Sequence, residues 1–420
     1  MLKFVARNSI LLHLILLSRG IDTLGAVHSG QELTHQRPFS YRRDKVKRKK
    51  RILIVGMNES PHLHTWIDGI EKSGIVKNIW LLPSDFPVNK IVNSKIDVMT
   101  FPFFGFGKVT NFLFRALDFM TNRLWRTYVL SLMIRILKPS HLHFHETQHA
   151  AYLFNPIANH PKLRFKGKLI VSTWGSDLQL YGRLSSHIQD LKDVAAWAHL
   201  ITSERTIDED ITNDLGFRGE FRAPVYITLG MDPEISALRK TSERNLILIK
   251  GYQDDHGRAL NALAAIEMVS QRLDLSVFEF RVFSASSSVA IQAEYLNDNM
   301  NLNVQVIPKL PKKEMLELFK DARAYIGLAI SDGLSTSMAE AMTFGAFPIQ
   351  SKNSSASVLI TNRVNGGKVD PWDLKQVCES LELALFDDDL VDKAAQINRE
   401  VIQDNYNLSI GMQRLAEIYE

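Results

Sequence analysis

The sequence predicts an α/β protein made of two Rossmann-like, doubly wound domains that face each other across a cleft. Short apolar runs rich in β-branched residues alternate with amphipathic helical segments, a pattern typical of parallel sheets covered by helices. The alternation restarts after Pro233. At 420 residues, the chain is too long for one typical core and fits two domains of ordinary size.

The first half of the chain contains five predicted strands, and the first of them is a short apolar run that suits a buried parallel strand. They are residues 52–55, 79–82, 141–145, 169–172 and 200–203. A helical pattern follows the first strand through Ile70, and another starts at Thr147. The amphipathic stretch over residues 111–138 predicts one long helix, which Pro139 stops.

The second half repeats this organisation. Its predicted strands are residues 245–250, 278–283, 304–307, 324–328 and a last strand at Phe347, and its predicted helices are residues 259–272 and 312–322. The tail over residues 390–420 is also predicted to be helical. We therefore expect an N-terminal arm over residues 1–50, a first Rossmann-like domain over 51–235, a second over 236–390, and a C-terminal helix over 391–420 that packs towards the first domain.

The N-terminal arm concentrates the positive charge. Residues 42–51 carry a net charge of +7 against +4 for the whole chain, so the rest is close to −3. A body this close to neutral lacks the excess of positive charge that a nucleic-acid-binding protein carries. The apolar run over residues 10–17 is far shorter than the ~20 residues that span a bilayer. We expect the arm to be disordered or to rest on an anionic membrane surface; a cleaved leader and a solvated linker are the alternatives.

Cysteine usage indicates the compartment. Cys378 is the single cysteine of the sequence, so no intrachain disulfide is possible. A reducing cytoplasm is the simplest location for such a chain.

The most informative segment runs over residues 332–345 and reads DGLSTSMAEAMTFG. It predicts a glycine-containing loop that leads into a helix, with Ser335, Thr336 and Ser337 as N-cap candidates. Ser337 and Glu340 are spaced as a capping box, and Gly345 suits the C-terminal stop. The free N–H groups at such a helix start suit a phosphate or diphosphate. Because carboxylates repel phosphate, Asp332 and Glu340 should bind hydroxyl groups of a sugar or ribose. A nucleotide-sugar has both parts; an ordinary capped helix is the alternative.

This segment resembles the acidic-x7-Glu motif of retaining glycosyltransferases with the GT-B fold, sequence family 4, of the bacterial polysaccharide type. The following strand at residues 346–349 and the segments 365–367 and 369–371 are also similar to that family. The family usually has glutamate where Asp332 stands. The resemblance implies that Asp332 binds the donor sugar and Glu340 the nucleotide ribose, as the catalytic pair. The N–H groups that would bind the phosphate and sugar are those of Gly333, Leu334 and Ser335.

The resemblance also implies a set of donor-binding residues at the end of the strand over residues 245–250. Lys250 and Gly251 close this strand, and His256 and Arg258 follow. Charge builds on a diphosphate as it leaves, and cations stabilise that charge. His256 stands where the family usually has lysine, and we expect it to assist Lys250 and Arg258. Ordinary surface charges on a loop are the alternative.

Three residues are expected on the acceptor side. His143 and His145 alternate on one strand and so share a face; we expect at least one to be structural and assign His145 to the acceptor side. Residues 173–177 resemble the family signature Thr-x-His-Gly-x-Asp, with Trp174 at the histidine position. Trp174 would stack on a sugar face, and Asp177 would bind an acceptor hydroxyl.

The resemblance implies a retaining glycosyltransferase that moves a sugar from a nucleotide-sugar to a hydroxyl of a glycan or lipid-linked sugar, in surface polysaccharide synthesis. It implies no cofactor and no bound metal. The cysteine usage, the basic arm and the near-neutral body add the expectation of a cytoplasmic enzyme, peripheral on the membrane, with no nucleic-acid partner. In the family's proposed front-face mechanism, the leaving phosphate helps to deprotonate the incoming hydroxyl. Two alternatives remain open: a sugar-nucleotide 2-epimerase, and a catalytically degenerate, binding-only member of a glycan assembly complex.

Overall fold

The computed structural model of the protein describes residues 50–58, 60–85, 99–100, 108–160, 163, 165–225, 238–254, 256–354 and 358–420. The predicted N-terminal arm lies outside these residues except for Lys50, and so does the predicted junction between the two domains near residue 235. The predicted domain boundaries therefore stay predictions.

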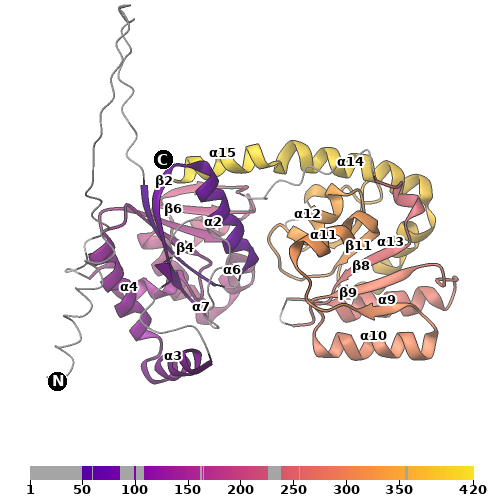
Figure 1. The fold of residues 1–420 in the computed structure, drawn as a ribbon, viewed down its shortest axis with the longest axis horizontal. Helices are drawn as coiled ribbons and strands as arrows, with labels where there is room; N and C mark the ends of the chain where they lie inside the picture. The colour runs from indigo at the N-terminus through magenta and orange to yellow at the C-terminus, as the bar shows by residue number, and fades with distance from the viewer. Residues whose placement is uncertain are drawn as a thin grey trace, which may run out of the picture. The chain divides into compact units, whose positions relative to one another are not determined.

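The first sheet has seven described strands, all paired in parallel, in the order β3-β2-β1-β4-β5-β6-β7 (Figure 1). The strands are β1 (Lys50–Gly56), β2 (Val76–Pro83), β3 (Met99–Thr100), β4 (His141–His145), β5 (Lys168–Thr173), β6 (Leu200–Ser203) and β7 (Glu220–Arg222). The order of strands reverses between β1 and β4. In open parallel sheets, ligands bind outside the carboxyl ends of strands at such a switch point.

The second sheet has six described strands in the order β10-β9-β8-β11-β12-β13, again all parallel. The strands are β8 (Leu246–Lys250), β9 (Glu279–Phe283), β10 (Val304–Val306), β11 (Ala322–Gly327), β12 (Phe347–Ser351) and β13 (Gly367–Val369). The switch point lies between β8 and β11. The predicted donor residues follow these two strands.

Helices cover both faces of each sheet, which explains why the strands read as continuous apolar runs. In β1, Leu53 and Val55 face one buried cluster, while Ile52 and Ile54 face another. The described helices of the first half are α2 (Pro61–Ser73), α3 (Lys108–Thr121), α4 (Leu124–Leu137), α5 (Asn155–Ala158), α6 (Ser176–Gln179), α7 (Ser185–Trp197) and α8 (Asp208–Asp214), with 3-10 turns η1 (Ala151–Leu153) and η3 (Tyr181–Arg183).

In the second half, the described helices are α9 (Ala259–Ser270), α10 (Ser287–Met300), α11 (Lys312–Asp321), α12 (Thr336–Thr343), α13 (Leu374–Phe386), α14 (Asp388–Tyr406) and α15 (Leu408–Ile418), with the 3-10 turn η5 (Thr241–Glu243). Among the helices of the described residues, none combines the length and apolar character that crossing a membrane requires.

Two predicted helices differ from the structure. The long helix over residues 111–138 is wrong, because Asn122 and Arg123 take left-handed φ values of 46° and 65° and separate α3 from α4. A helix starting at Thr147 is also wrong: turns lead into the short η1 and α5. The N–H of Thr147 donates to the carboxylate of Asp177, so a loop contact fixes the backbone there.

The C-terminal helix crosses back to the first domain, as predicted. Helix α14 contacts α12 and α13 in the second half, whereas α15 contacts α2 in the first. Leu415, Ile418 and Tyr419 are buried in the same cluster as Ile52 and Ile54 of β1. The predicted fold class is therefore confirmed: two Rossmann-like α/β domains of the GT-B type joined by a returning C-terminal helix.

Candidate functional site

The site begins with an ion pair at the switch point of the second sheet. Lys250 is the last residue of β8, and Asp332 lies in the loop after β11. The Nζ of Lys250 lies 3.1 Å from Oδ2 of Asp332. The two side chains are only 17% and 24% exposed. Two residues predicted to bind the donor, 82 positions apart in sequence, are thus brought together.

The surroundings keep Lys250 charged. Burial alone would lower the pKa of Lys250, but the nearby Asp332 carboxylate and the hydroxyls of Tyr325 and Tyr252 raise it above its ordinary value. The ammonium group also lies 5.1 Å from the centre of the Tyr252 ring. A cation is therefore fixed where a donor diphosphate is expected.

Helix α12 begins at Thr336, with Ser335 as its N-cap residue. The predicted capping box is wrong, because the helix starts before Ser337 and this residue already lies in its first turn. Glu340 is instead 3.6 Å from Nζ of Lys312 in α11. Burial raises the pKa of Glu340, and Lys312 opposes that change. The predicted stop at Gly345 is confirmed by its left-handed φ of 83°.

The loop that enters α12 carries polar groups that the described part of the chain leaves without partners. The buried hydroxyl oxygens of Ser331 and Thr336 have no hydrogen-bond partner among the described residues. The hydroxyl of Ser335 forms a hydrogen bond with the hydroxyl of Tyr325, with 3.2 Å between the two oxygens. These unpartnered hydroxyls flank residues 332–335, where the donor is expected.

Glu204 is a site residue that the sequence reasoning missed. It follows β6 in the first domain, and its Oε2 accepts a hydrogen bond from the N–H of Leu334 at 2.5 Å. A Cβ atom at Gly333 would lie 2.0 Å from the same oxygen, so a larger residue there would displace the Glu204 side chain. One signal in the sequence could have found Glu204: it follows a predicted strand, as Trp174 follows β5. The carboxyl ends of parallel strands lie at one edge of the sheet, so residues that follow the strands lie near each other.

The electrostatics of Glu204 are unusual. Burial raises the pKa of Glu204 to about 8, and the carboxylates of Asp332, Asp177 and Asp208 add to the effect while the Leu334 N–H opposes it. The carboxyl group is thus protonated near neutral pH. A protonated carboxyl can donate one hydrogen bond and accept others.

His256 and Arg258 lie beside the same loop. The N–H of Ile330 donates to the carbonyl of His256 at 2.8 Å, which places the segment next to the approach to Asp332. The guanidinium of Arg258 stacks over the ring of Trp372 at 4.5 Å. Its Nη1 donates to the carbonyl of Asp254 at 3.0 Å.

The N–H of Gly251 is already used within the protein. That N–H donates to the carbonyl of Phe283 at 2.8 Å. A Cβ atom at Gly251 would lie 2.7 Å from the Cα of Ala285. The structure thus gives Gly251 a packing role, and its contact with a donor stays a prediction.

The two histidines of β4 have different surroundings. The ring of His143 bonds through Nδ1 to the Tyr419 hydroxyl at 2.6 Å and through Nε2 to Ser172 at 2.7 Å, which is a structural role. His145 is fully buried 4.1 Å from the His143 ring, and neither of its nitrogens has a partner among the described residues. Burial, aided by His62, lowers the pKa of His145 to about 3, so its ring is neutral.

Asp177 shapes the loop that carries Trp174. Its two carboxylate oxygens accept the backbone N–H groups of Thr147 and Trp174. Burial, followed by Glu146, raises the pKa of Asp177 to about 7. A Cβ atom at Gly175 would lie 2.2 Å from the backbone nitrogen of Gly333, so this loop touches the donor loop. The structure thus gives Asp177 a positioning role, and its contact with an acceptor stays a prediction.

Four of the predicted site residues carry buried nitrogen atoms without a partner among the described residues. Within the described chain, His145, Trp174, His256 and Arg258 each have a buried nitrogen without a hydrogen-bond partner. Leaving such a group unpaired costs about 1–3 kcal/mol. Folded proteins accept this cost mainly where water, an ion or a ligand supplies the missing bond.

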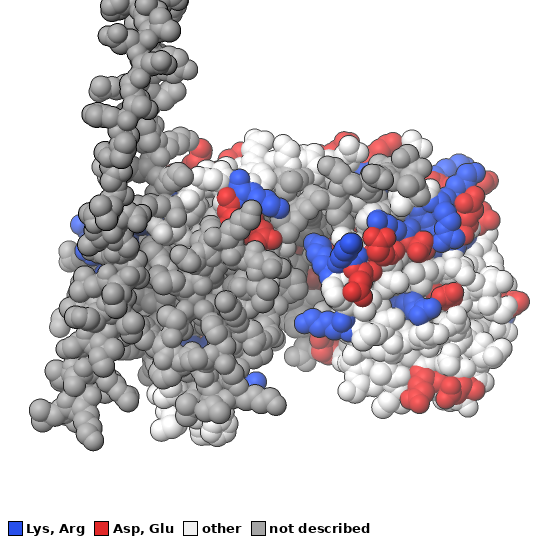
Figure 2. All heavy atoms as spheres, viewed as in Figure 1, with Lys and Arg blue, Asp and Glu red and all other residues white. Residues whose placement is uncertain are grey.

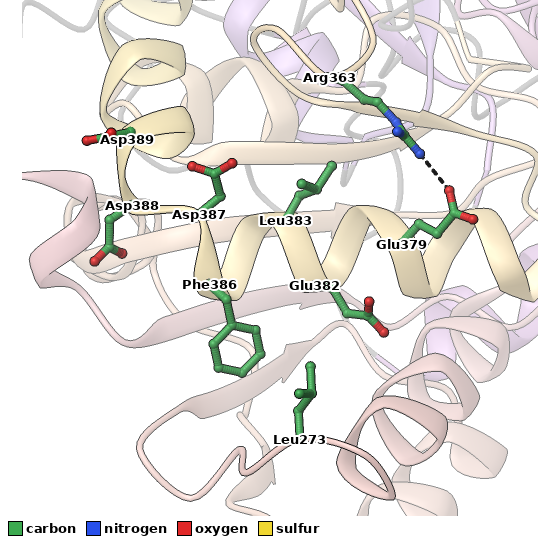
Figure 3. Close-up of a pocket in the computed structure, with 9 residues that line it drawn as sticks. All are labelled: Leu273, Arg363, Glu379, Glu382, Leu383, Phe386, Asp387, Asp388 and Asp389. Carbon is green, nitrogen blue, oxygen red and sulfur yellow. Dashed lines mark hydrogen bonds and ion pairs between the residues drawn. The ribbon is translucent and has the colours of Figure 1, made fainter.

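An open pocket of about 720 Å³ lies elsewhere in the second domain, around the end of α13 and the start of α14 (Figure 3). Asp388, one of its lining residues, pairs with Arg323 at the start of β11. The pocket is therefore near the amino ends of the strands, opposite the ends that carry Lys250 and Asp332. Its acidic lining, including Glu382 and Asp387, is unsuited to a diphosphate.

Residues 239–401 match the model of the family described as glycosyl transferases group 1. The fold is similar to that of sucrose-phosphate synthase from Thermosynechococcus elongatus, with a TM-score of 0.66 and 12% identity, over 88% of this chain and 98% of that chain. It is also similar to HepE from Anabaena in complex with UDP and glucose, with a TM-score of 0.63 and 12% identity, over 88% and 99% of the two chains. The apo lipopolysaccharide outer core galactosyltransferase WaaB gives a TM-score of 0.62 and 12% identity, over 87% and 98%.

No curated protein sequence matches the chain significantly. The structural likenesses establish the GT-B fold. Together with the family match over the second domain, they support a glycosyltransferase with this fold.

Proposed function

We propose that the protein is a retaining glycosyltransferase of family 4. It would transfer a sugar from a nucleotide-sugar to a hydroxyl of a glycan or lipid-linked sugar, in surface polysaccharide synthesis. The observation that carries the proposal is the pair of Lys250 and Asp332, held at the β8–β11 switch point beside the start of α12. A fixed cation, a carboxylate and the start of a helix match the parts of a nucleotide-sugar.

The donor would lie along this cluster. Lys250 and Arg258, with His256, would hold the diphosphate, and the N–H groups of residues 333–335 would bind phosphate and sugar oxygens. Glu340 would accept hydrogen bonds from the ribose, and Asp332 from the sugar hydroxyls. The N–H of Leu334, which now donates to Glu204, would donate to the nucleotide-sugar. Glu204 would then give up this hydrogen bond or share it.

Transfer would follow the front-face route. The acceptor oxygen bonds to the anomeric carbon on the face from which the phosphate leaves, while the bond from that carbon to the phosphate oxygen breaks. The proton of the acceptor hydroxyl passes to the leaving phosphate, so no side-chain base is needed. Lys250 and Arg258 stabilise the negative charge that builds on the diphosphate.

Similarity to solved structures supports the choice of donor class. Structures of HepE from Anabaena contain UDP, UDP with glucose, and UDP-glucose. We take this as support for a nucleotide-sugar donor in the present protein. The acceptor, on the side of His145, Trp174 and Asp177, would meet the donor where residues 174–175 touch the donor loop. We further propose a cytoplasmic, membrane-peripheral enzyme that needs no bound metal.

The test measures release of nucleoside diphosphate from a panel of nucleotide-sugars, with and without glycan acceptors. The proposal expects release that depends on an acceptor and a product with the anomeric configuration of the donor. Release of free sugar and UDP without any acceptor would favour a 2-epimerase. Saturable binding of donors without turnover under any acceptor would favour the binding-only alternative, motivated by His256, Trp174 and Asp332 at altered family positions.

A further inference from the structure

Lys312 is a cation beside the candidate site that has no role in the proposed function. It is the first residue of α11, and its Nζ lies 3.6 Å from Oε1 of Glu340 in α12. The Lys312 side chain is 53% exposed, whereas that of Glu340 is only 13% exposed. The ion pair therefore joins an exposed cation to a carboxylate that is nearly enclosed.

The place of Lys312 in its own helix is electrostatically unfavourable. The N-terminal end of a helix carries partial positive charge, which favours acidic residues there and disfavours basic ones. Helix α11 nevertheless begins with Lys312 and Lys313, and Glu314 is the acid of its first turn. Charged side chains of both signs lie on the surface around α11 (Figure 2). Lys312 thus gains nothing from its own helix dipole, and Glu340 is the partner that favours a cation at this position.

Glu340 depends on Lys312 for its charge. Burial raises the pKa of Glu340, and the charge and hydrogen bond of Lys312 oppose that change. Among the described residues, the side chain of Glu340 has no other ion pair or hydrogen bond. Without this cation, the enclosed carboxyl group would favour its neutral form more strongly.

Other charged or titratable groups lie around this pair, on β8, on the loop before α12, on α14 and on α2. They are Lys250, Asp332, Arg399, His62 and Asp68. The first two pair with each other, and the third lies against Gly345, just beyond the end of α12. The charge of Lys312 reaches the last two, which are in the first domain. Lys312 is the charged group that acts on Glu340.

We propose that Lys312 is a positioning residue for the donor nucleotide, which holds the carboxylate of Glu340 in place to bind the ribose. This role rests on the proposed function, in which Glu340 accepts hydrogen bonds from the ribose. A carboxylate has about four acceptor sites, so an ammonium group beside Oε1 leaves sites for two ribose hydroxyls. Lys312 would act through Glu340 and would not itself touch the sugar or the diphosphate.

The test is calorimetric titration, near pH 6 and near pH 8.5, of whichever of UDP, GDP and ADP binds the wild type most tightly. Lys312→Met should weaken binding near pH 6 by roughly tenfold, because Glu340 then protonates and its charge-assisted hydrogen bonds become neutral ones. Removing the cation raises the pKa of Glu340, so the carboxyl group ionises again as pH rises. The difference between variant and wild type should therefore shrink near pH 8.5.

Two variants serve as controls for charge and for folding. Lys312→Arg keeps the cation and should bind like the wild type. Lys313→Met removes the same charge from the next position of the same helical turn, which is exposed, and should also bind like the wild type. Exposed ion pairs contribute little to stability, so all three variants should unfold at the temperature of the wild type.

The Glu340→Gln background separates an action through Glu340 from a direct contact with the ligand. Adding Lys312→Met to Glu340→Gln should weaken binding no further. An equal loss in both backgrounds would overturn the proposal and place Lys312 on the phosphates. Equal affinity of wild type and Lys312→Met, with binding measured in both, would overturn this role and leave the proposed function standing. No binding of any of the three nucleotides to the wild type would overturn both together.

Discussion

Replacing Glu204 with glutamine should remove a pH dependence from the stability of the protein. Glutamine keeps an oxygen that can accept the Leu334 N–H but has no proton to lose. In the wild type, the pKa of Glu204 is raised from 4.5 to about 8, by burial first and then by neighbouring carboxylates. Between these two pH values, the folded state holds a proton that the unfolded state has lost. Stability therefore falls as pH rises through this window.

The size of the effect follows from the pKa difference. Each pKa unit corresponds to about 1.4 kcal/mol, so the ceiling between 4.5 and about 8 is about 5 kcal/mol. The side chain of Glu204 is half-buried, and opening its contact with Leu334 would relieve part of the cost. We expect an effect on the order of 2 kcal/mol, equivalent to roughly 2–4 °C in Tm.

The assay is thermal unfolding of wild type and Glu204→Gln from pH 5 to pH 9. The contribution of Asp177 to the stability of the protein also falls with rising pH, since its pKa is raised to about 7. This contribution is the same in both proteins. The difference between the two Tm curves isolates Glu204. The Tm of the variant minus that of the wild type should rise steadily with pH and level off above about pH 8. Parallel curves across the whole range would refute this reasoning.

Three further predictions concern named side chains. Glu340→Gln should weaken nucleotide and nucleotide-sugar binding alike, by roughly 1.5–3 kcal/mol, whereas Asp332→Asn should keep nucleoside diphosphate affinity and lower turnover. Calorimetry measures the affinities and initial rates measure turnover. Loss of nucleotide binding in Asp332→Asn with unchanged binding in Glu340→Gln would invalidate both roles. Arg258→Ala should weaken nucleoside diphosphate binding far more than nucleoside binding, and equal losses would place Arg258 away from the phosphates. Tyr419→Phe should cost about 1–3 kcal/mol of unfolding free energy, because it leaves Nδ1 of buried His143 unpaired. Urea unfolding measures this cost, with Tyr295→Phe as the exposed control. Equal stability of the two variants would show that the hydrogen bond does not contribute to stability.

Much of the fold could be predicted because buried parallel strands leave an unambiguous pattern. The run at residues 52–55 is apolar on both faces, since helices cover both sides of the sheet. The break between α3 and α4 could not be predicted. Asn122 and Arg123 have no glycine or proline to signal their left-handed backbone, and the amphipathic pattern continues through them.

The candidate site was predicted in part. Lys250 and Asp332 were both singled out, but their ion pair depends on β8 and β11 being neighbours, which the strand order decides. Glu204 escaped notice although its position after β6 was an available signal. Its importance comes from a contact with Leu334, 130 positions away in the sequence. The capping box failed for a smaller reason: α12 starts at Thr336, before Ser337.

The central claim is that a nucleotide-sugar binds at the β8–β11 switch point, and calorimetric titration of UDP, GDP and ADP into wild type and Lys250→Met tests it most directly. Methionine keeps the length of the side chain and removes its charge. Losing a charge-assisted contact of roughly 1.5–3 kcal/mol corresponds to a tenfold to hundredfold change in Kd. The account predicts that at least one of these nucleoside diphosphates binds the wild type and that Lys250→Met weakens it by at least about tenfold. Binding of equal strength to both proteins, or no binding of any of the three to the wild type, would contradict it.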